Sequence, residues 1–458
     1  MKFYGRTPEL KAMGRLTKNF RIAVVGRRRI GKTTLVEHHY DKKCITLFIP
    51  AEKAEKEIVS DWVKEYGQLH LPQVTSFKDF FDFIFYHLKD RIFFIDEIQN
   101  VLKVNKSFLS DLQRLIDKYK PNLVVSGSLI GTMKRIVEDY KSPLYGRFDL
   151  IIKLRELDFR TIHEICRDFK MSTEQAIRFY SVFGGVPKYY ELLEKMGFPD
   201  LEEFVLDMFV RYPRPLYEEV KTMLKEEFGK EHRTFFTILS AISQGNNRSS
   251  EIAGYLGKKE TEITKYLAML RDEFEIIDRV VPVVGGKKGI YVIKSNLVSF
   301  WFRNIWRHSQ LFETGQEKQV EEIVLRDLDL FISRAFEGIV HELFIGGAFP
   351  FEHTSIGRQW GKIPGAPKDR NQYEIDLLAL NERTHDALFV ECKWQKDVNA
   401  LTVLERLVTH SSSVQWRNGR RGEQYAIFAK SFKKKIAREN LYLFDLKDIT
   451  RILLGSGS

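Results

Sequence analysis

A glycine-rich segment near the start of the chain restricts the possible folds more than any other feature. It reads Gly26-Arg-Arg-Arg-Ile-Gly31-Lys32-Thr33 and follows an apolar run at residues 22–25. The apolar run predicts a buried strand, the glycines predict a tight turn, and the residues from about Thr33 onward predict a helix. In such a turn, backbone N–H groups converge on phosphate oxygens, and the start of the helix favours negative charge. The segment therefore predicts an α/β fold with a phosphate-binding loop.

The spacing G-x-x-x-x-G-K-T assigns roles to the residues of this loop. Lys32 would reach the β- and γ-phosphates of ATP, and the Thr33 hydroxyl would hold Mg²⁺. The other loop residues expected to contact the nucleotide are Gly26, Arg29, Ile30, Gly31 and Thr34. A chance glycine-rich turn is the alternative, but the strand before the loop and the amphipathic helix after it favour a nucleotide site.

A second apolar run brings acids to the same edge of the predicted sheet. Residues 92–95 are apolar and are followed by Asp96 and Glu97. Open α/β sheets bind ligands at the carboxyl ends of their strands, so we expect Asp96 to bind Mg²⁺ through water. Glu97 would polarise the attacking water for hydrolysis. A strand that merely ends in solvated acids is the alternative.

Two later segments complete the predicted nucleotide site. Residues 123–128 predict a strand that ends near Ser126 and Ser128, and either hydroxyl could sense the γ-phosphate. An ordinary strand-to-helix turn is the alternative for both serines. Arg147 is a candidate arginine finger, which would stabilise charge on the transferred phosphoryl group. A surface arginine is the alternative there.

The composition restricts the surroundings and partners of the chain. Its 458 residues exceed what one hydrophobic core usually supports, so several domains are expected. No apolar run approaches the ~18 residues of a membrane span, so no membrane association is expected. Three widely spaced cysteines suit a reducing, cytoplasmic compartment. The net charge of +11 favours an anionic partner, with nucleic acid first.

Residues 216–300 predict a run of helices followed by a β-hairpin with strands at residues 280–284 and 290–293, an order typical of a winged helix-turn-helix. In a DNA-binding role, four lysines would contact phosphates: Lys259, Lys265, Lys287 and Lys288. Glu260 and Glu262 lie at the start of the expected recognition helix and would repel the DNA backbone. DNA binding and a purely internal role both stay open.

A second chemical cluster lies near the end of the chain. Residues 373–380 and 387–394 predict two strands joined by a polar turn. Because side chains alternate along a strand, this hairpin can bring Asp376, Glu391 and Lys393 together. The carboxylates would bind one or two Mg²⁺ ions, and Lys393 would orient water or offset transition-state charge. This chemistry suits phosphodiester hydrolysis, and a solvated hairpin with paired charges is the alternative.

A basic segment follows this cluster. Residues 411–438 contain eight lysines and arginines against one acid, Glu423. Such a segment could follow a DNA backbone beside the second site, or it could be an ordinary solvated face.

The motifs together resemble the archaeal branch of the STAND/AAA+ P-loop ATPases. The resemblance rests on Gly5-Arg6 with Glu9-Leu10, the arginine-rich loop, Asp96-Glu97-Ile-Gln, Ser126-Gly-Ser128, Ser142-Pro-Leu-Tyr-Gly-Arg147 and Phe183-Gly-Gly-Val-Pro187. It implies an ATPase core, a helical lid in which Pro187 packs near the adenine, and a winged helix.

The last part of the chain resembles the PD-(D/E)xK nucleases. The resemblance rests on Glu374-Ile-Asp376 and Glu391-Cys-Lys393-Trp394, with Ile375 where that motif has its proline. It implies that Glu337, on the first helix of this domain, joins the metal site.

The predicted fold is an α/β chain with an ASCE P-loop NTPase parallel sheet, and it has five parts. These are a P-loop AAA+/STAND ATPase core (1–158), a helical lid (159–215), a winged helix-turn-helix (216–300), a helical connector (301–330) and a restriction-endonuclease-like α/β domain (331–458).

The leading functional hypothesis is a DNA-associated ATPase whose nucleotide state controls a Mg²⁺-dependent nuclease-like domain. The alternatives are a STAND-type nucleotide-dependent switch and a transcription regulator, each with an inactive nuclease-like domain. A homo-oligomer is compatible with each, and Arg147 could act within its own subunit or on a neighbour.

Overall fold

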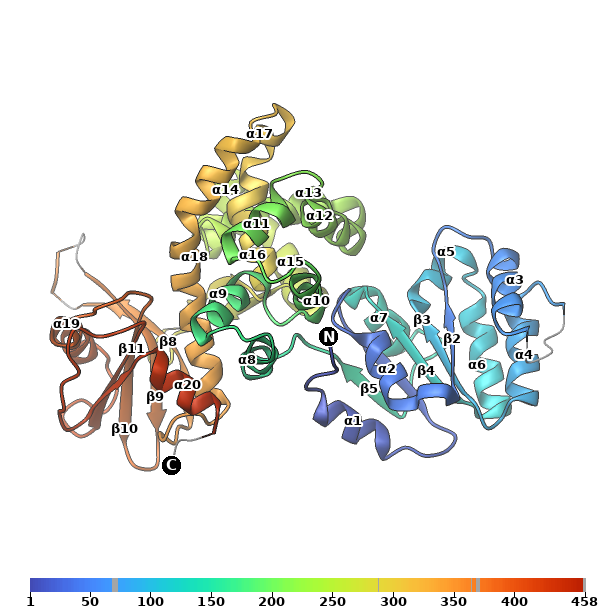
Figure 1. Cartoon of the computed structure of the whole chain (residues 1–458), viewed down its shortest axis with the longest axis horizontal. Helices are drawn as coiled ribbons and strands as arrows, with labels where there is room; N and C mark the ends of the chain where they lie inside the picture. Colours follow the sequence, from blue (N-terminus) through green and yellow to red (C-terminus); the bar gives the residue numbers. More distant parts are fainter. Residues whose placement is uncertain (68–72, 287, 364, 368–370, 456–458) are drawn as a thin grey trace. The chain divides into compact units, whose positions relative to one another are not determined.

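The computed structural model of the protein describes residues 1–458 except 68–72, 287, 364, 368–370 and 456–458 (Figure 1). Lys287, one of the lysines predicted to contact phosphates, lies outside the described residues. The chain divides into two compact units. Unit 1 comprises Met1–Leu157, Val186–Tyr189 and Met223–Gly229, and unit 2 comprises Asp158–Gly185, Tyr190–Thr222 and Lys230–Ser458.

A parallel sheet with the strand order β2-β3-β4-β1-β5 forms the centre of unit 1. Its strands are β1 (Arg21–Val25), β2 (Cys44–Phe48), β3 (Ile92–Asp96), β4 (Asn122–Gly127) and β5 (Leu150–Lys153). Every residue of β3 is buried, as expected for a strand whose two faces are both covered by helices. The predicted parallel α/β sheet is therefore confirmed.

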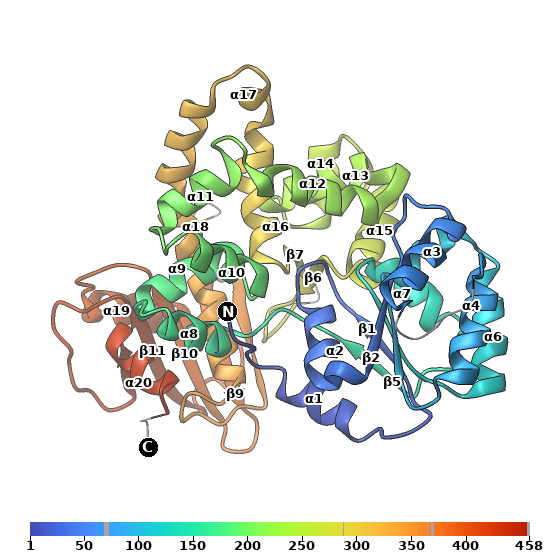
Figure 2. The same cartoon turned by 45° about the vertical axis from the view of Figure 1, so that its right-hand side comes forward.

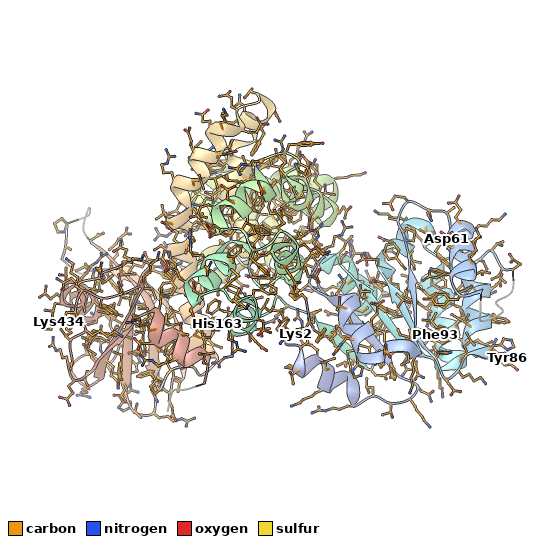
Figure 3. The ribbon with its side chains drawn as sticks, viewed as in Figure 1. Lys2, Asp61, Tyr86, Phe93, His163 and Lys434 are labelled. Carbon is orange, nitrogen blue, oxygen red and sulfur yellow. The ribbon has the colours of Figure 1, made fainter. Side chains whose placement is uncertain are left out.

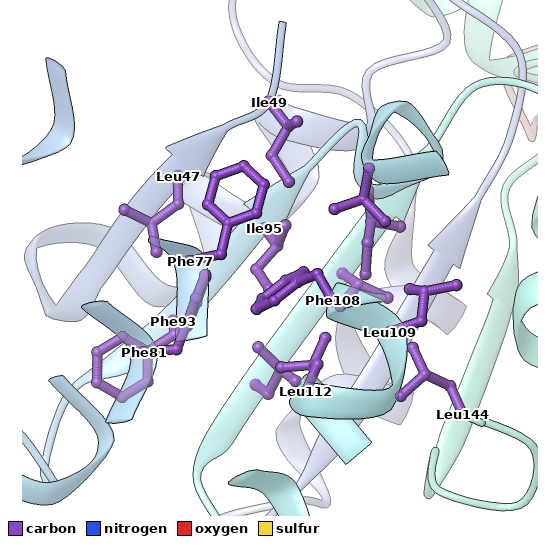
Figure 4. Close-up of a cluster of buried hydrophobic side chains, with 14 of the residues drawn as sticks. Leu47, Ile49, Phe77, Phe81, Phe93, Ile95, Phe108, Leu109, Leu112 and Leu144 are labelled. Atoms are coloured by element: carbon purple, nitrogen blue, oxygen red, sulfur yellow. The ribbon is translucent and has the colours of Figure 1, made fainter. Parts of the chain in front are cut away.

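Helices cover both faces of this sheet. They are α1 (Thr7–Gly14), α2 (Lys32–Tyr40), α3 (Glu55–Glu65), α4 (Phe77–His87), α5 (Val101–Val104), α6 (Phe108–Tyr119) and α7 (Ile130–Val137). The alternation of strand side chains divides the core: Phe93 packs with residues of α3, α4 and α6, and Phe94 packs with residues of α1 and α2. Figure 4 shows the first cluster, in which the Phe81 and Phe108 rings lie 5.2 Å apart.

Short helices form the first part of unit 2 and its connections to unit 1. They are α8 (Phe159–Asp168), α9 (Thr173–Phe183), α10 (Pro187–Lys195), α11 (Leu201–Phe209), α12 (Pro215–Phe228), α13 (His232–Ser243), α14 (Ser249–Leu256), α15 (Glu260–Ala268), α16 (Asn296–Phe300) and α17 (Ser309–Glu313). A hairpin of β6 (Ile277–Val280) and β7 (Ile290–Ile293) follows α15.

The first strand of this hairpin ends earlier than predicted. Residues 281–284 were expected to continue it, but the chain leaves β6 before Pro282, which has no N–H to donate to a strand ladder. Instead, Val283 N donates to Arg358 O at 3.3 Å, and Val284 N donates to Gln359 Oε1 at 2.8 Å. The hairpin loop therefore contacts strand β8 (Ser355–Lys362) of the following sheet.

A mixed sheet with the order β12-β11-β10-β9-β8 ends the chain (Figure 2). Its other elements are β9 (Gln372–Asn381), β10 (Asp386–Lys393), α19 (Ala400–Ser412), β11 (Gly422–Ala429), β12 (Leu441–Phe444) and α20 (Leu446–Leu453). Strand β10 pairs antiparallel with β9 and parallel with β11, and α19 forms the crossover between β10 and β11. The two strands predicted at 373–380 and 387–394 correspond to β9 and β10.

A long helix, α18 (Glu317–Ile345), links this sheet to α8 and α9 within unit 2 (Figure 1). The carboxylate of Glu342 accepts hydrogen bonds from Phe159 N, at the start of α8, and from Tyr180 Oη in α9. Lys430 and Glu174 also form an ion pair at 2.9 Å. The boundary predicted between residues 330 and 331 falls inside α18. No helix among the described residues is both long enough and apolar enough to span a membrane.

Candidate functional site

Two glycines shape the loop between β1 and α2. A Cβ atom at Gly26 would lie 2.8 Å from Leu154 O, so only glycine lets the loop pass this close to the end of β5. Gly31 has a φ of +91°, and α2 begins at the next residue, Lys32. Arg6, a residue not predicted as part of the site, donates from Nη2 to Ile30 O at 3.0 Å and from Nη1 to Arg155 O at 2.7 Å. Its buried guanidinium fixes the loop against the segment after β5.

Lys32 is a buried cation at the centre of this loop. Its Nζ donates to Arg27 O at 3.2 Å and lies 3.7 Å from Glu97 Oε1. Burial lowers the pKa of Lys32, and the carboxylates of Glu97 and Asp96 oppose this effect. A phosphate group beside the ammonium would offset its desolvation, so the loop fits an anionic nucleotide.

Hard oxygen ligands lie next to Lys32. Thr33 Oγ1 donates to Asp96 Oδ2 at 2.7 Å, and Asp96 Oδ1 accepts from Glu97 N at 3.0 Å and from Ser126 Oγ. Hydroxyl and carboxylate oxygens are the ligands that Mg²⁺ prefers, so this pair fits the ion that accompanies ATP. Ser126, considered as a γ-phosphate sensor, is completely buried against Asp96 and orients that carboxylate instead.

Glu97 follows β3 in a left-handed conformation, with a φ of 58°. Its Oε2 accepts hydrogen bonds from Ser128 Oγ, at 2.6 Å, and from Gln99 Nε2. Ser128 was predicted as part of the site, whereas Gln99 was not. The signal that could have identified Gln99 is its place in the Asp96-Glu97-Ile-Gln motif, two positions after Glu97.

Arg147 and Pro187, the remaining residues predicted to contact the nucleotide, lie among other partners than the loop at residues 26–34. Arg147 pairs with Asp117 of α6, with Nε 3.0 Å from Oδ1 and Nη2 3.0 Å from Oδ2. Its guanidinium also donates to Tyr145 O at 3.1 Å, and both of these partners lie outside the phosphate-binding loop. Pro187 is the first residue of α10 and belongs to the short segment Val186–Tyr189 of unit 1.

The structure brings Asp376, Glu391 and Lys393 together on β9 and β10. Asp376 Oδ2 accepts from the Cys392 N–H at 2.7 Å, between the other two residues in sequence. Lys393 Nζ donates to Glu391 Oε1 at 2.5 Å. Burial raises the pKa of Asp376 well above its usual value, and Glu337 and Glu391 raise it further.

Glu337 reaches the same cluster from α18. Burial raises the pKa of Glu337 to about 7; Arg358 opposes the shift, and Glu374 and Glu391 add to it. Arg358, which the site prediction did not include, has Nη2 3.4 Å from Glu337 Oε2 and 2.7 Å from Glu374 Oε1. The site is therefore a set of closely spaced carboxylates held by two cations, Arg358 and Lys393, from the strands on either side of β9.

The predicted metal ligands are close but not arranged around one point. Among the residues that the structure describes, no group of three or more His, Cys, Asp or Glu side chains is placed to hold a metal ion. Each carboxylate has its own partner: Glu337 pairs with Arg358, Glu391 with Lys393, and Asp376 with the Cys392 N–H. The donor chemistry fits Mg²⁺ once these partners give way.

The basic segment at 411–438 carries less free charge than its composition predicts. Four of its eight cations pair with acids of the chain: Arg417 with Glu382, Arg421 with Glu423, Lys430 with Glu174, and Lys435 with Asp445 and Asp448. Arg421 is also nearly buried and donates to three backbone carbonyls, so its role is structural. The exposed remainder includes Lys434, labelled in Figure 3. Acids of the chain therefore neutralise half of the eight cations that were expected to follow a DNA backbone.

Comparison with known proteins identifies two regions of the chain. Residues 3–193 match a model described as an ATPase domain predominantly from Archaea. Residues 301–405 match DUF234, described as archaeal and bacterial proteins of unknown function. The chain therefore contains an ATPase domain, and this domain includes the loop, Asp96 and Glu97.

One solved structure has a similar fold, and one relative is similar to this chain over nearly its whole length. The fold resembles that of the Walker-type ATPase PABY2304 of Pyrococcus abyssi, with a TM-score of 0.52 and 18% identity, over 66% of this chain and 96% of that one. The uncharacterized protein MJECL04 of Methanocaldococcus jannaschii is 34% identical over 98% of this chain and 100% of its own length. The chain belongs to the same family as this Methanocaldococcus jannaschii protein, with an archaeal ATPase domain followed by a DUF234 region.

Proposed function

We propose that the chain hydrolyses ATP at the loop of residues 26–34. The observation that supports this most directly is the meeting of Lys32, Thr33, Asp96 and Glu97 at the carboxyl ends of β1 and β3. Lys32 would bind the β- and γ-phosphates, and Thr33 and Asp96 would hold Mg²⁺, which neutralises charge on the transferred phosphoryl group. Glu97 would accept a proton from the attacking water.

Two substitutions test this assignment. Lys32→Ala should abolish binding of a fluorescent ATP analogue, because the loop loses its phosphate-binding cation. Glu97→Gln should retain binding but lower kcat by about 100-fold or more. Lys53→Ala, which removes an exposed lysine paired with Asp61, is the matched control and should match the wild type. Turnover that survives in Glu97→Gln would show that another group activates the water.

We further propose that α18 and the sheet β8–β11 form a nuclease-like domain that acts on DNA. The support is the adjacency of Asp376, Glu391 and Lys393, with Glu337 contributed by a helix packed against β9 and β10. Mg²⁺ at the carboxylates would polarise the phosphodiester. In this proposal α13–α15 with the β6–β7 hairpin form a winged helix that holds DNA, and the nucleotide state of unit 1 controls cleavage.

DNA cleavage assays with Mg²⁺ or Mn²⁺ test the second site. Lys393→Ala should remove cleavage, whereas Lys396→Ala, which changes an exposed lysine of the same segment, should retain it. Cleavage that persists in Lys393→Ala would overturn the assignment.

A nucleotide-dependent switch without cleavage is the second candidate function. It is favoured by the internal partners that now engage each carboxylate of the cluster. In this case ATP should change the oligomeric state, measured by light scattering, while no divalent ion supports cleavage.

A further inference from the structure

We propose that Gln99 is a positioning residue of the ATPase site, which orients Glu97 during hydrolysis. The inference rests on the proposed role of Glu97 as the group that accepts the proton. Gln99 lies in a short 3₁₀ turn, Ile98–Asn100, directly after Glu97. Its side chain is 4% exposed, and its Nε2 donates to Glu97 Oε2 and lies 3.5 Å from Ser128 Oγ. One buried amide therefore contacts both Glu97 and Ser128, the groups expected beside the γ-phosphate.

Gln99 is the donor that stays available to Glu97 when nucleotide binds. In the structure, Glu97 is near Lys32 through Oε1 and accepts from Ser128 and Gln99 through Oε2. Lys32 turns to the phosphates, and the single hydroxyl proton of Ser128 can be donated to Glu97 or to the γ-phosphate, but not to both. The amide of Gln99 has two N–H donors and therefore keeps Glu97 in place throughout.

The packing around Gln99 supports a functional rather than a structural role. Its Oε1 is buried without a hydrogen-bond partner among the described residues, an arrangement that disfavours folding. The amide is nevertheless held with its NH₂ group toward Glu97, because the opposite orientation would place two acceptor oxygens together. Gly127 provides the space, since a Cβ atom there would lie 2.4 Å from Gln99 Oε1.

Two variants of similar size separate positioning from packing. Gln99→Met removes the donors, and Gln99→Glu replaces them with a second negative charge. For Gln99→Met we expect kcat to fall about 10- to 100-fold, with the Kd of a fluorescent ATP analogue unchanged within about threefold. Gln99→Glu should lower kcat further.

The control is Asn100→Met in the same turn. The Asn100 amide donates to Ile49 O at 2.8 Å, so this variant should lower the melting temperature without the fall in kcat expected for Gln99→Met. A wild-type kcat in both Gln99 variants, or a parallel loss of nucleotide binding and turnover, would overturn the inference. If Gln99→Met does not fold, the same comparison of kcat and nucleotide Kd is made with Gln99→Glu.

Glu97→Gln, measured in parallel, separates this inference from the proposed function. Loss of turnover in Glu97→Gln together with wild-type Gln99 variants overturns only the role of Gln99. Turnover that survives in Glu97→Gln overturns both.

Discussion

Raising the pH in the absence of divalent cations should lower the unfolding free energy of unit 2, and ionisation of Glu337 should be a main cause. Burial is the largest reason that its pKa rises to about 7 from 4.5. The native state therefore keeps this proton to a higher pH than the unfolded chain. The resulting stability is fully present below the unfolded pKa and is lost as the pH rises through about 7. The difference corresponds to about 3 kcal/mol of unfolding free energy, at about 1.4 kcal/mol per pH unit.

Urea unfolding in EDTA, followed by tryptophan fluorescence at about pH 5 and about pH 8, measures this loss. Five of the six tryptophans belong to unit 2: Trp301, Trp306, Trp360, Trp394 and Trp416. Because Glu337→Gln cannot ionise, its unfolding free energy should fall by about 2.5 kcal/mol less than that of the wild type over this interval, since part of the full difference lies below pH 5.

Glu322→Gln, on an exposed position of the same helix, is the control and should follow the wild type. An equal loss of stability in the wild type and in Glu337→Gln would refute the reasoning.

Four further predictions concern packing and one buried hydrogen bond. Gly127→Ala should destabilise unit 1 by about 1–3 kcal/mol and lower kcat, because its Cβ would meet Gln99 Oε1 at 2.4 Å. Gly254→Ala on α14 has nothing among the described residues within 4 Å of the new Cβ, so it should stabilise by about 0.5–1 kcal/mol; thermal unfolding checks both variants. Phe108→Ala should cost about 3–5 kcal/mol in urea unfolding, and a loss below about 1 kcal/mol would contradict the buried ring contacts. Glu342→Gln should cost about 1–3 kcal/mol with unchanged ATP affinity, because α8 loses a charged acceptor; unfolding and nucleotide titration measure the two effects.

The features that could be predicted from the sequence are local ones. The loop at Gly26–Thr33 has a fixed spacing, and the apolar run before Asp96 defines a buried strand without reference to the rest of the chain. In the same way, alternation along β9 and β10 was enough to expect Asp376 near Lys393. The structure brings these residues together, as the patterns predicted.

The features that were missed depend on contacts between distant segments. Gln99 meets Ser128 because β3 and β4 are neighbours in the sheet, and its place in the Asp96-Glu97-Ile-Gln motif did not reveal this contact. Arg358 comes from β8, whose sequence has two glycines and little apolar alternation, so no strand was predicted there. The basic segment was interpreted as free charge because the acid that pairs with Lys430 lies on α9, far away in the sequence.

Helix α18 carries two carboxylates with different partners near its carboxyl end. Glu337 faces the carboxylate cluster and Glu342 holds the first turn of α8, five residues further along the same helix. That separation is about 7.5 Å along the axis, over which an α-helix behaves as a stiff rod. If a bound ion or substrate displaced Glu337, the contact of Glu342 with α8 would be displaced by a similar amount, because both residues belong to one continuous helix.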